Sequence, residues 1–147
     1  ALSWRPRVLI LDEPTVGLDA VSRHQIFGEL LAAVQDGERS VLISSHALSD
    51  LERLTDHVGM IKDGKMVLEG LTSEIVEAYR LVDFTSDESH PWESAPGWHV
   101  QKRENNRWRV LVDTRRHDLD RLSERGGRQI NTAPVSLEDL FVALAKE

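Results

Sequence analysis

Short apolar runs bounded by turn residues alternate along this chain with segments whose apolar positions recur at helical spacing. Residues 8–11 and 41–43 are runs of the first kind, with the length and boundaries of strands buried on both faces. Between them, the apolar residues of 20–35 fall on one stripe, which predicts a helix with Asp19 as its N-cap. The order strand, helix, strand predicts a parallel pair of strands.

The alternation continues to about residue 80. Asp63 and Gly64 are a two-residue hairpin signal between two strand patterns, and Gly70 is expected to end the second strand. Alternating strands and helices favour an α/β fold, but the strands are too few for a complete sheet, so we interpret residues 1–80 as the second half of one. The other elements predicted here are a helix over 48–55, strands over 58–61 and 65–69, and a helix over 73–79.

The composition changes near Asp83. Acidic residues, serines and two prolines between 85 and 97 are typical of a linker. The domains predicted from this change are 1–80, a linker over 81–97, and a small α+β domain over 98–147. Within the last domain the pattern predicts a β-hairpin over 98–112, a helix over 119–124, a strand over 129–133, and a final helix with Ser136 as N-cap and Asp139 at the capping-box position.

Composition narrows the class of protein. The chain has 147 residues, a formal net charge of −7 and no cysteine. The negative charge disfavours a general nucleic-acid binder. The lack of cysteine excludes a disulfide framework and a thiolate metal site, and it fits an intracellular location. No apolar run approaches the roughly 18 residues that a membrane span needs.

A local nucleic-acid interpretation centres on Trp108, because an aromatic ring among basic residues can stack on bases. The positions around it alternate apolar with polar, which favours instead a hairpin with the ring inside and the charges outside. The basic neighbours are Lys102, Arg103, Arg107 and Arg109.

Two carboxylates, Asp12 and Glu13, directly follow the first apolar strand. Ligands of open α/β sheets bind at the carboxyl ends of strands. There, an aspartate can hold Mg²⁺ through its waters, and a neighbouring glutamate can orient the water that attacks a phosphoryl group. The alternative interpretation is that the two residues are only a polar exit from the strand.

His46 closes the next apolar strand, after Ser44 and Ser45, and is therefore expected at the same edge of the sheet as Glu13. It can contact a transferred phosphate there, or it can be a structural histidine. The other histidines have no such context, and we interpret them as structural or surface residues: His24, His57, His90, His99 and His117.

In this combination and spacing, the segments resemble the nucleotide-binding subunits of ABC transporters over about residues 1–80. Residues 8–13 match the Walker B strand, Gly-Leu-Asp at 17–19 matches the D-loop, and His46 matches the switch histidine. Residues 136–141 are similar to a tail segment of the exporter type. The implied fold is the C-terminal half of a P-loop NTPase-like α/β domain, followed by a small α+β domain.

The resemblance also implies roles for single residues. Asp12 would associate with Mg²⁺, and Glu13 would be the general base or orient the attacking water. Asp19 would meet a second ATPase subunit across a nucleotide-sandwich dimer, and His46 would sense the γ-phosphate. Ser45 has no implied role beyond a polar contact at the strand end.

The implied activity is ATP hydrolysis coupled to transmembrane export. ATP and Mg²⁺ are the implied cofactors. A membrane permease and the second ATPase subunit are the implied partners, with no nucleic acid. The implied location is cytoplasmic, peripheral at the inner face of the cell membrane.

The chain departs from the family pattern where the phosphates are bound. It has no G-x-x-x-x-G-K-[ST] loop, no glutamine loop and no Leu-Ser-Gly-Gly-Gln signature, and residues 1–6 look like the tail of the helix after that signature. We therefore expect a C-terminal portion that alone neither binds ATP tightly nor hydrolyses it, with a partly unburied N-terminal face. Three alternatives stay open: a soluble ABC ATPase that is not a transporter, a non-catalytic interaction scaffold, and an unrelated Mg²⁺ hydrolase built on Asp12, Glu13 and His46.

Overall fold

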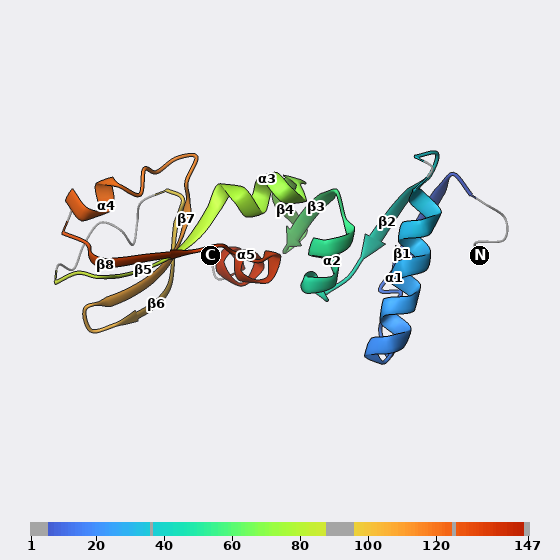
Figure 1. Ribbon diagram of the computed structural model, residues 1–147, viewed down its shortest axis with the longest axis horizontal. Helices are drawn as coiled ribbons and strands as arrows, with labels where there is room; N and C mark the ends of the chain where they lie inside the picture. Colours follow the sequence, from blue (N-terminus) through green and yellow to red (C-terminus); the bar gives the residue numbers. More distant parts are fainter. Residues whose placement is uncertain (1–5, 36, 88–95, 125, 146–147) are drawn as a thin grey trace. The chain divides into compact units, whose positions relative to one another are not determined.

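The chain forms two compact units, Ala1–Leu54 and Thr55–Glu147, which we call unit 1 and unit 2 (Figure 1). The computed structural model describes residues 6–35, 37–87, 96–124 and 126–145. The predicted helix end at residues 1–4 and residues 88–95 of the predicted linker lie outside the described residues. The division at Leu54 follows from compactness, and the predicted domain boundary near residue 80 stays a prediction.

Unit 1 contains two strands and two helices in the predicted order. Strand β1 pairs with β2 in parallel, and the register places Asp12 opposite Ser44. Helix α1 begins after Asp19, whose side chain accepts a hydrogen bond from the backbone of Ser22, so the predicted N-cap is confirmed. The elements are β1 (Val8–Asp12), α1 (Ala20–Val34), β2 (Ser40–Ser44) and α2 (Leu48–Leu54).

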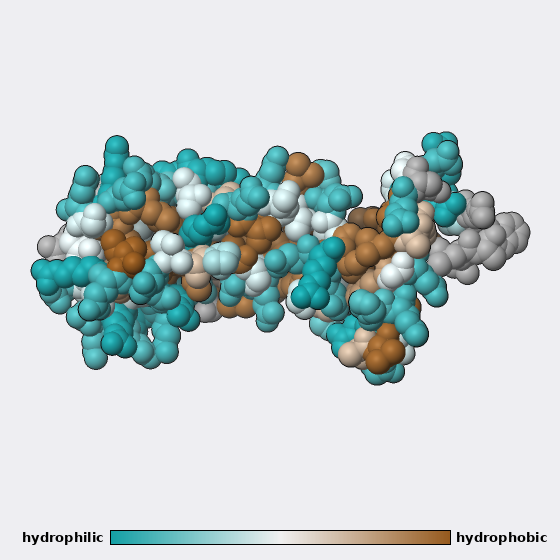
Figure 2. Space-filling view, in the orientation of Figure 1, coloured by the Kyte–Doolittle hydropathy of each residue, from teal (hydrophilic) through white to brown (hydrophobic). Residues whose placement is uncertain are grey.

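One face of the β1–β2 pair carries apolar side chains that remain in water. Val8, Ile10 and Leu42 are 60%, 71% and 64% exposed. Apolar atoms accordingly reach the surface of unit 1 among hydrophilic ones (Figure 2). These exposures show that the expectation of strands buried on both faces is wrong, because one face of the pair has no covering layer. They agree with the other expectation, a partly unburied N-terminal face.

Unit 2 begins with a β-hairpin of β3 (His57–Lys62) and β4 (Lys65–Leu71). The turn residues Asp63 and Gly64 have φ values of 50° and 75°. Two consecutive positive φ values are the geometry of the two-residue turn that matches the twist of a hairpin. The predicted hairpin is therefore confirmed.

Gly70 does not end β4, contrary to the expectation from sequence. The strand continues through Leu71, and helix α3 (Thr72–Ala78) follows directly. Gly70 has a φ of 154°, which residues with a Cβ rarely adopt, and a Cβ there would lie 3.4 Å from Cδ1 of Ile75. Glycine here allows the close approach of α3 to the strand rather than breaking the strand.

The rest of unit 2 is a four-stranded antiparallel sheet in the order β6-β7-β5-β8 (Figure 1). Strand β5 is not among the predicted elements, and it places residues 81–85 of the predicted linker next to the centre of the sheet. The antiparallel sheet with helices confirms the α+β class. The elements are β5 (Tyr79–Thr85), β6 (Trp98–Glu104), β7 (Arg107–Asp113), α4 (Arg121–Glu124), β8 (Arg128–Ala133) and α5 (Leu137–Leu144).

The core of this sheet is built around Trp108, which is 2% exposed. Its ring stacks on Phe84 with centroids 6.1 Å apart, and the guanidinium of Arg103 lies 4.3 Å from its centre. The ring is thus inside, as the alternation predicts, and at 2% exposure it offers no open face to a nucleic-acid base. The other members of the cluster are Val82, Trp98, Val110, Val112 and Leu122.

Helix α5 begins with the predicted capping box. The hydroxyl of Ser136 accepts a hydrogen bond from the backbone of Asp139 at 3.1 Å, and the Asp139 carboxylate accepts one from the Ser136 backbone at 2.9 Å. Leu137 and Leu140 are fully buried. Phe141, which the sequence places on the same apolar face, is instead 38% exposed.

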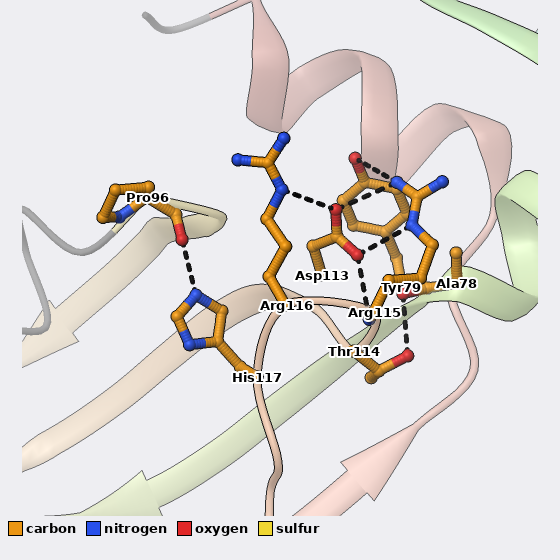
Figure 3. A network of polar contacts seen from close by, with 8 residues as sticks. All are labelled: Ala78, Tyr79, Pro96, Asp113, Thr114, Arg115, Arg116 and His117. Atoms are coloured by element: carbon orange, nitrogen blue, oxygen red, sulfur yellow. Dashed lines mark hydrogen bonds and ion pairs between the residues drawn. The ribbon is translucent and has the colours of Figure 1, made fainter.

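A polar network joins the end of β7 to the junction of α3 and β5 (Figure 3). The carboxylate of Asp113, only 5% exposed, accepts hydrogen bonds from Nε and Nη2 of Arg115 at 2.9 Å each. The hydroxyl of Thr114 donates to the carbonyl of Ala78 at 2.9 Å. Burial raises the pKa of Asp113, but the hydrogen bonds from Arg115 and the charges of Arg115 and Arg116 outweigh it, so the pKa lies below its usual value.

Candidate active site

The carboxyl ends of β1 and β2 meet at one edge of unit 1, because the two strands run parallel in register. Asp12 and Ser44 are register partners at that edge. The hydroxyl of Ser44 donates a hydrogen bond to Oδ1 of Asp12 at 2.5 Å. Asp12 is exposed, so its carboxylate can meet a ligand that arrives from solvent.

Glu13, the next residue, adopts an unusual backbone conformation with a φ of 44°. Residues with side chains rarely take positive φ values unless the surroundings hold them there. Its amide donates to the carbonyl oxygen of Ser44 at 3.1 Å and to the Ser44 hydroxyl at 3.0 Å. Its own carbonyl accepts from Val16 at 3.2 Å, which closes a turn.

His46 lies two residues beyond Ser44 and contacts the Glu13 side chain. Its Nδ1 is 3.0 Å from Oε2 of Glu13, and the two side chains are 78% and 36% exposed. With Nδ1 engaged, Nε2 is the ring nitrogen that can reach a phosphate. The structure therefore brings together three of the residues singled out from sequence, namely Asp12, Glu13 and His46.

Asp19 makes its contacts elsewhere, at the start of α1. It accepts hydrogen bonds from the backbone and hydroxyl of Ser22 at 2.9 Å and 3.0 Å, which lower its pKa in that order. Ser45, for which no role is expected, accepts a hydrogen bond from the backbone of Ala47 at 3.0 Å. Both contacts are local: the first caps α1, and the second stabilises the chain just after β2.

The arrangement fits Mg²⁺ that is shared with a ligand rather than caged by protein. Mg²⁺ is usually held by one or two carboxylates together with substrate phosphates and water. Among the residues that the structure describes, no group of three or more His, Cys, Asp or Glu side chains could hold a metal ion. Asp12 offers one exposed carboxylate at the strand end, the kind of ligand that such a site would use.

Ser44 is the site residue that the sequence interpretation missed. It stands in the run Ser44-Ser45-His46, but its contacts depend on the register of β1 against β2. A signal was present, since counting back from the two strand ends places Asp12 and Ser44 at equivalent positions. Only the pairing of the strands shows that the hydroxyl reaches the carboxylate.

Comparison with known proteins finds relatives over nearly the whole chain. The Nod factor export ATP-binding protein I of Rhizobium etli is 28% identical over 98% of this chain and 47% of its own length. The protein of the same name from Cupriavidus metallidurans is 30% identical over 98% of this chain and 49% of its own length. The ABC transporter ATP-binding protein YtrB of Bacillus subtilis is 35% identical over 56% of this chain and 28% of its own length. No protein-family model matches the chain.

Among solved structures, cbiO1 from Clostridium perfringens, described as part of the ABC transporter complex cbiONQ, is similar with a TM-score of 0.46. It is 32% identical and covers 50% of this chain and 30% of the other. The chain spans about half the length of the curated relatives that match it over most of its residues. Within the described part of the chain, no helix combines the length and the apolar character of a membrane-spanning helix.

Proposed function

We propose that this chain, a relative of the ATP-binding proteins of ABC transporters, supplies the hydrolytic edge of an ATP-hydrolysing site. The observation that carries the proposal is the 3.0 Å contact between Oε2 of Glu13 and Nδ1 of His46 at the ends of two parallel strands. A polar exit from a strand needs no such pairing. The contact places a carboxylate and an imidazole where ligands of α/β sheets bind.

In this proposal, each side chain has one task. Glu13 orients a water and accepts its proton, while His46 presents Nε2 to the γ-phosphate and holds the Glu13 carboxylate through Nδ1. Asp12 would hold Mg²⁺ through water, and the ion would supply neutralisation of the charge that develops on the phosphoryl oxygens. Asp19 faces a second ATPase subunit with the part of its carboxylate that Ser22 leaves accessible.

The β- and γ-phosphates must be held by residues other than those of this chain. Phosphoryl transfer depends on positioning and electrostatics, and a phosphate-binding loop supplies most of the positioning. This chain contains no G-x-x-x-x-G-K-[ST] sequence. We therefore assign hydrolysis to an assembly of this chain with a phosphate-binding loop, and we expect no tight ATP binding by the chain alone.

The work that hydrolysis drives is export across a membrane. The names of the relatives support this, because 98% of this chain aligns with Nod factor export ATP-binding proteins. The partners are then a membrane permease and a second ATPase subunit. The location is the cytoplasmic face of the cell membrane, with no nucleic acid as partner.

Two measurements test the proposal: calorimetric titration of the chain with Mg·ATP, and ATPase assays of an assembly of this chain with a phosphate-binding loop. We expect no micromolar binding by the chain alone and measurable hydrolysis by that assembly. Micromolar affinity of the chain alone would contradict the proposal that residues outside this chain bind the phosphates. Hydrolysis that does not change when Glu13 is replaced by Gln would support the scaffold alternative instead.

A further inference from the structure

The hydroxyl of Ser44 is engaged on both its donor and its acceptor sides. It donates to Oδ1 of Asp12 at 2.5 Å and accepts from the backbone N–H of Glu13 at 3.0 Å. A hydroxyl has one proton to donate, and Asp12 is a carboxylate that only accepts when ionised. The direction of both hydrogen bonds is therefore fixed by chemistry.

We infer that Ser44 is a positioning residue that sets the orientation of both carboxylates of the proposed ATPase edge. The expected effect of Ser44 on ATP hydrolysis rests on the proposed function. The positioning of Asp12 and Glu13 by Ser44 rests on the contacts alone. The Ser44 side chain is uncharged, so it adds no charge to this edge. The hydroxyl instead fixes the orientation of the two carboxylates.

The first task of Ser44 concerns Glu13. The φ of Glu13, 44°, is uncommon for a residue with a side chain. The backbone N–H of Glu13 donates to two acceptors of Ser44, the carbonyl oxygen and the hydroxyl. This backbone conformation turns the Glu13 side chain toward His46. Loss of the hydroxyl leaves one acceptor and loosens the turn that aims the proposed base.

The second task concerns Asp12. The hydroxyl donates to Oδ1, so Oδ2 is the oxygen that would more readily accept from a metal-bound water. The carboxylate is exposed, and exposed side chains lose orientation easily because several rotamers are open to them. A strong hydrogen bond to an ionised carboxylate restricts that freedom.

The isosteric pair Ser44→Thr and Ser44→Val separates the hydroxyl from the shape of the side chain. Both replacements are β-branched and suit a strand, but only threonine retains the donor. In the 147-residue chain, amide hydrogen exchange of Glu13 and the ¹⁵N shifts of the His46 ring are measured by NMR. We expect Ser44→Val to speed exchange of the Glu13 amide by about 2- to 10-fold, the loss of one ordinary hydrogen bond, and to shift the His46 signals.

Ser44→Thr should stay close to the wild type in both measurements. Ser40→Val, at the other end of β2, is the matched control and should change neither. Equal behaviour of the Thr and Val variants at Glu13 and His46 would overturn the inference. So would an effect of Ser40→Val as large as that of Ser44→Val, because it would reduce the role of Ser44 to strand stability.

In an assembly of this chain with a phosphate-binding loop, Ser44→Val should lower kcat at least tenfold and change KM for ATP by less than about twofold, since it misorients groups that act in the transition state. An unchanged kcat with faster Glu13 exchange would overturn the catalytic part. Absence of hydrolysis in the wild type would count against the proposed function, whereas the exchange data would still decide whether Ser44 positions Glu13.

Discussion

His46 Nδ1 and Glu13 Oε2 lie 3.0 Å apart although the two residues are separated by 33 positions in the chain. Parallel pairing of β1 with β2 causes the proximity, and the two serines between Ile43 and His46 set how far the histidine extends past the strand. The contact ties the proposed general base to the proposed phosphate sensor.

Glu13→Gln should lower ATP hydrolysis by about 10²- to 10⁴-fold in an assembly of this chain with a phosphate-binding loop, because an amide cannot accept the proton of the attacking water. Binding of Mg·ATP should change little. Steady-state hydrolysis and nucleotide binding are measured side by side. Glu29→Gln, an exposed carboxylate on α1, is the matched control and should retain full activity.

Combining Glu13→Gln with His46→Ala tests whether the two side chains act as a unit. If they do, the double variant should lose about as much activity as the more severe single variant. The measurement is a double-mutant cycle on kcat. Losses that multiply independently would show that the contact has no part in catalysis.

The apolar face of β1 and β2 should bind a hydrophobic dye strongly, because Val8, Ile10 and Leu42 are mostly exposed. Replacing Ile10 and Leu42 by threonine should lower the dye fluorescence without lowering the melting temperature. Val21→Thr is the control, since Val21 is 69% exposed on α1 and lies outside the strand face. A dye-silent wild-type chain would contradict the prediction.

Unit 2 should lose stability in acid through Asp113. Its folded-state pKa lies below the value of about 3.9 that an unfolded chain would show, so its contribution is complete above that value and is lost as the pH falls through the lowered folded-state pKa. Asp113→Asn should cost about 2 kcal/mol at neutral pH and flatten the dependence on pH below about 4.

The measurement for Asp113 is unfolding by denaturant at several pH values, followed by tryptophan fluorescence of unit 2, where Trp98 and Trp108 are buried. Asp118→Asn is the control, because its side chain is 60% exposed in its ion pair with Arg121. If the Asn variant at 113 keeps the acid sensitivity of the wild type, Asp113 is not its source.

Two glycine-to-alanine changes should have opposite signs. Gly28 lies inside α1 with nothing within 4 Å of an added Cβ, so Gly28→Ala should stabilise by about 0.5–1 kcal/mol. At Gly127 an added Cβ would lie 2.8 Å from the carbonyl oxygen of Leu122, so Gly127→Ala should destabilise by about 1–3 kcal/mol. Thermal unfolding of both variants measures the sign of each change in stability. An unchanged stability of Gly127→Ala would show that the backbone around α4 can shift to accommodate the added Cβ.

Features set by neighbouring residues could be predicted from the sequence. The Asp63 and Gly64 turn, the Asp19 N-cap and the Ser136 capping box depend on local hydrogen bonds and φ preferences, and all three are confirmed. The alternation around Trp108 also sufficed to place its ring inside. In each case the residues that cause the structure lie within a few positions of one another.

Features set by residues far apart in the sequence could not be predicted from it. Strand β5 follows α3 without a break and runs into a polar segment, so only its pairing with β7 and β8 identifies it. The sequence predicts that Gly70 ends a strand, but the strand continues, and the glycine instead leaves room for the side chain of Ile75. The hydroxyl of Ser44 meets Asp12 only through the register of two strands about thirty residues apart.

The two units differ in how their strands are supported. In unit 1 the described strands form a pair, and apolar side chains on one of its faces are exposed to water. An isolated pair of strands has only marginal stability. The four-stranded sheet of unit 2, by contrast, encloses fully buried side chains. The chain should therefore melt in two steps, with unit 1 opening first and its amides exchanging fastest. Limited proteolysis should accordingly leave a resistant fragment that begins near Thr55, and folding should proceed from the C-terminal end of the chain backwards.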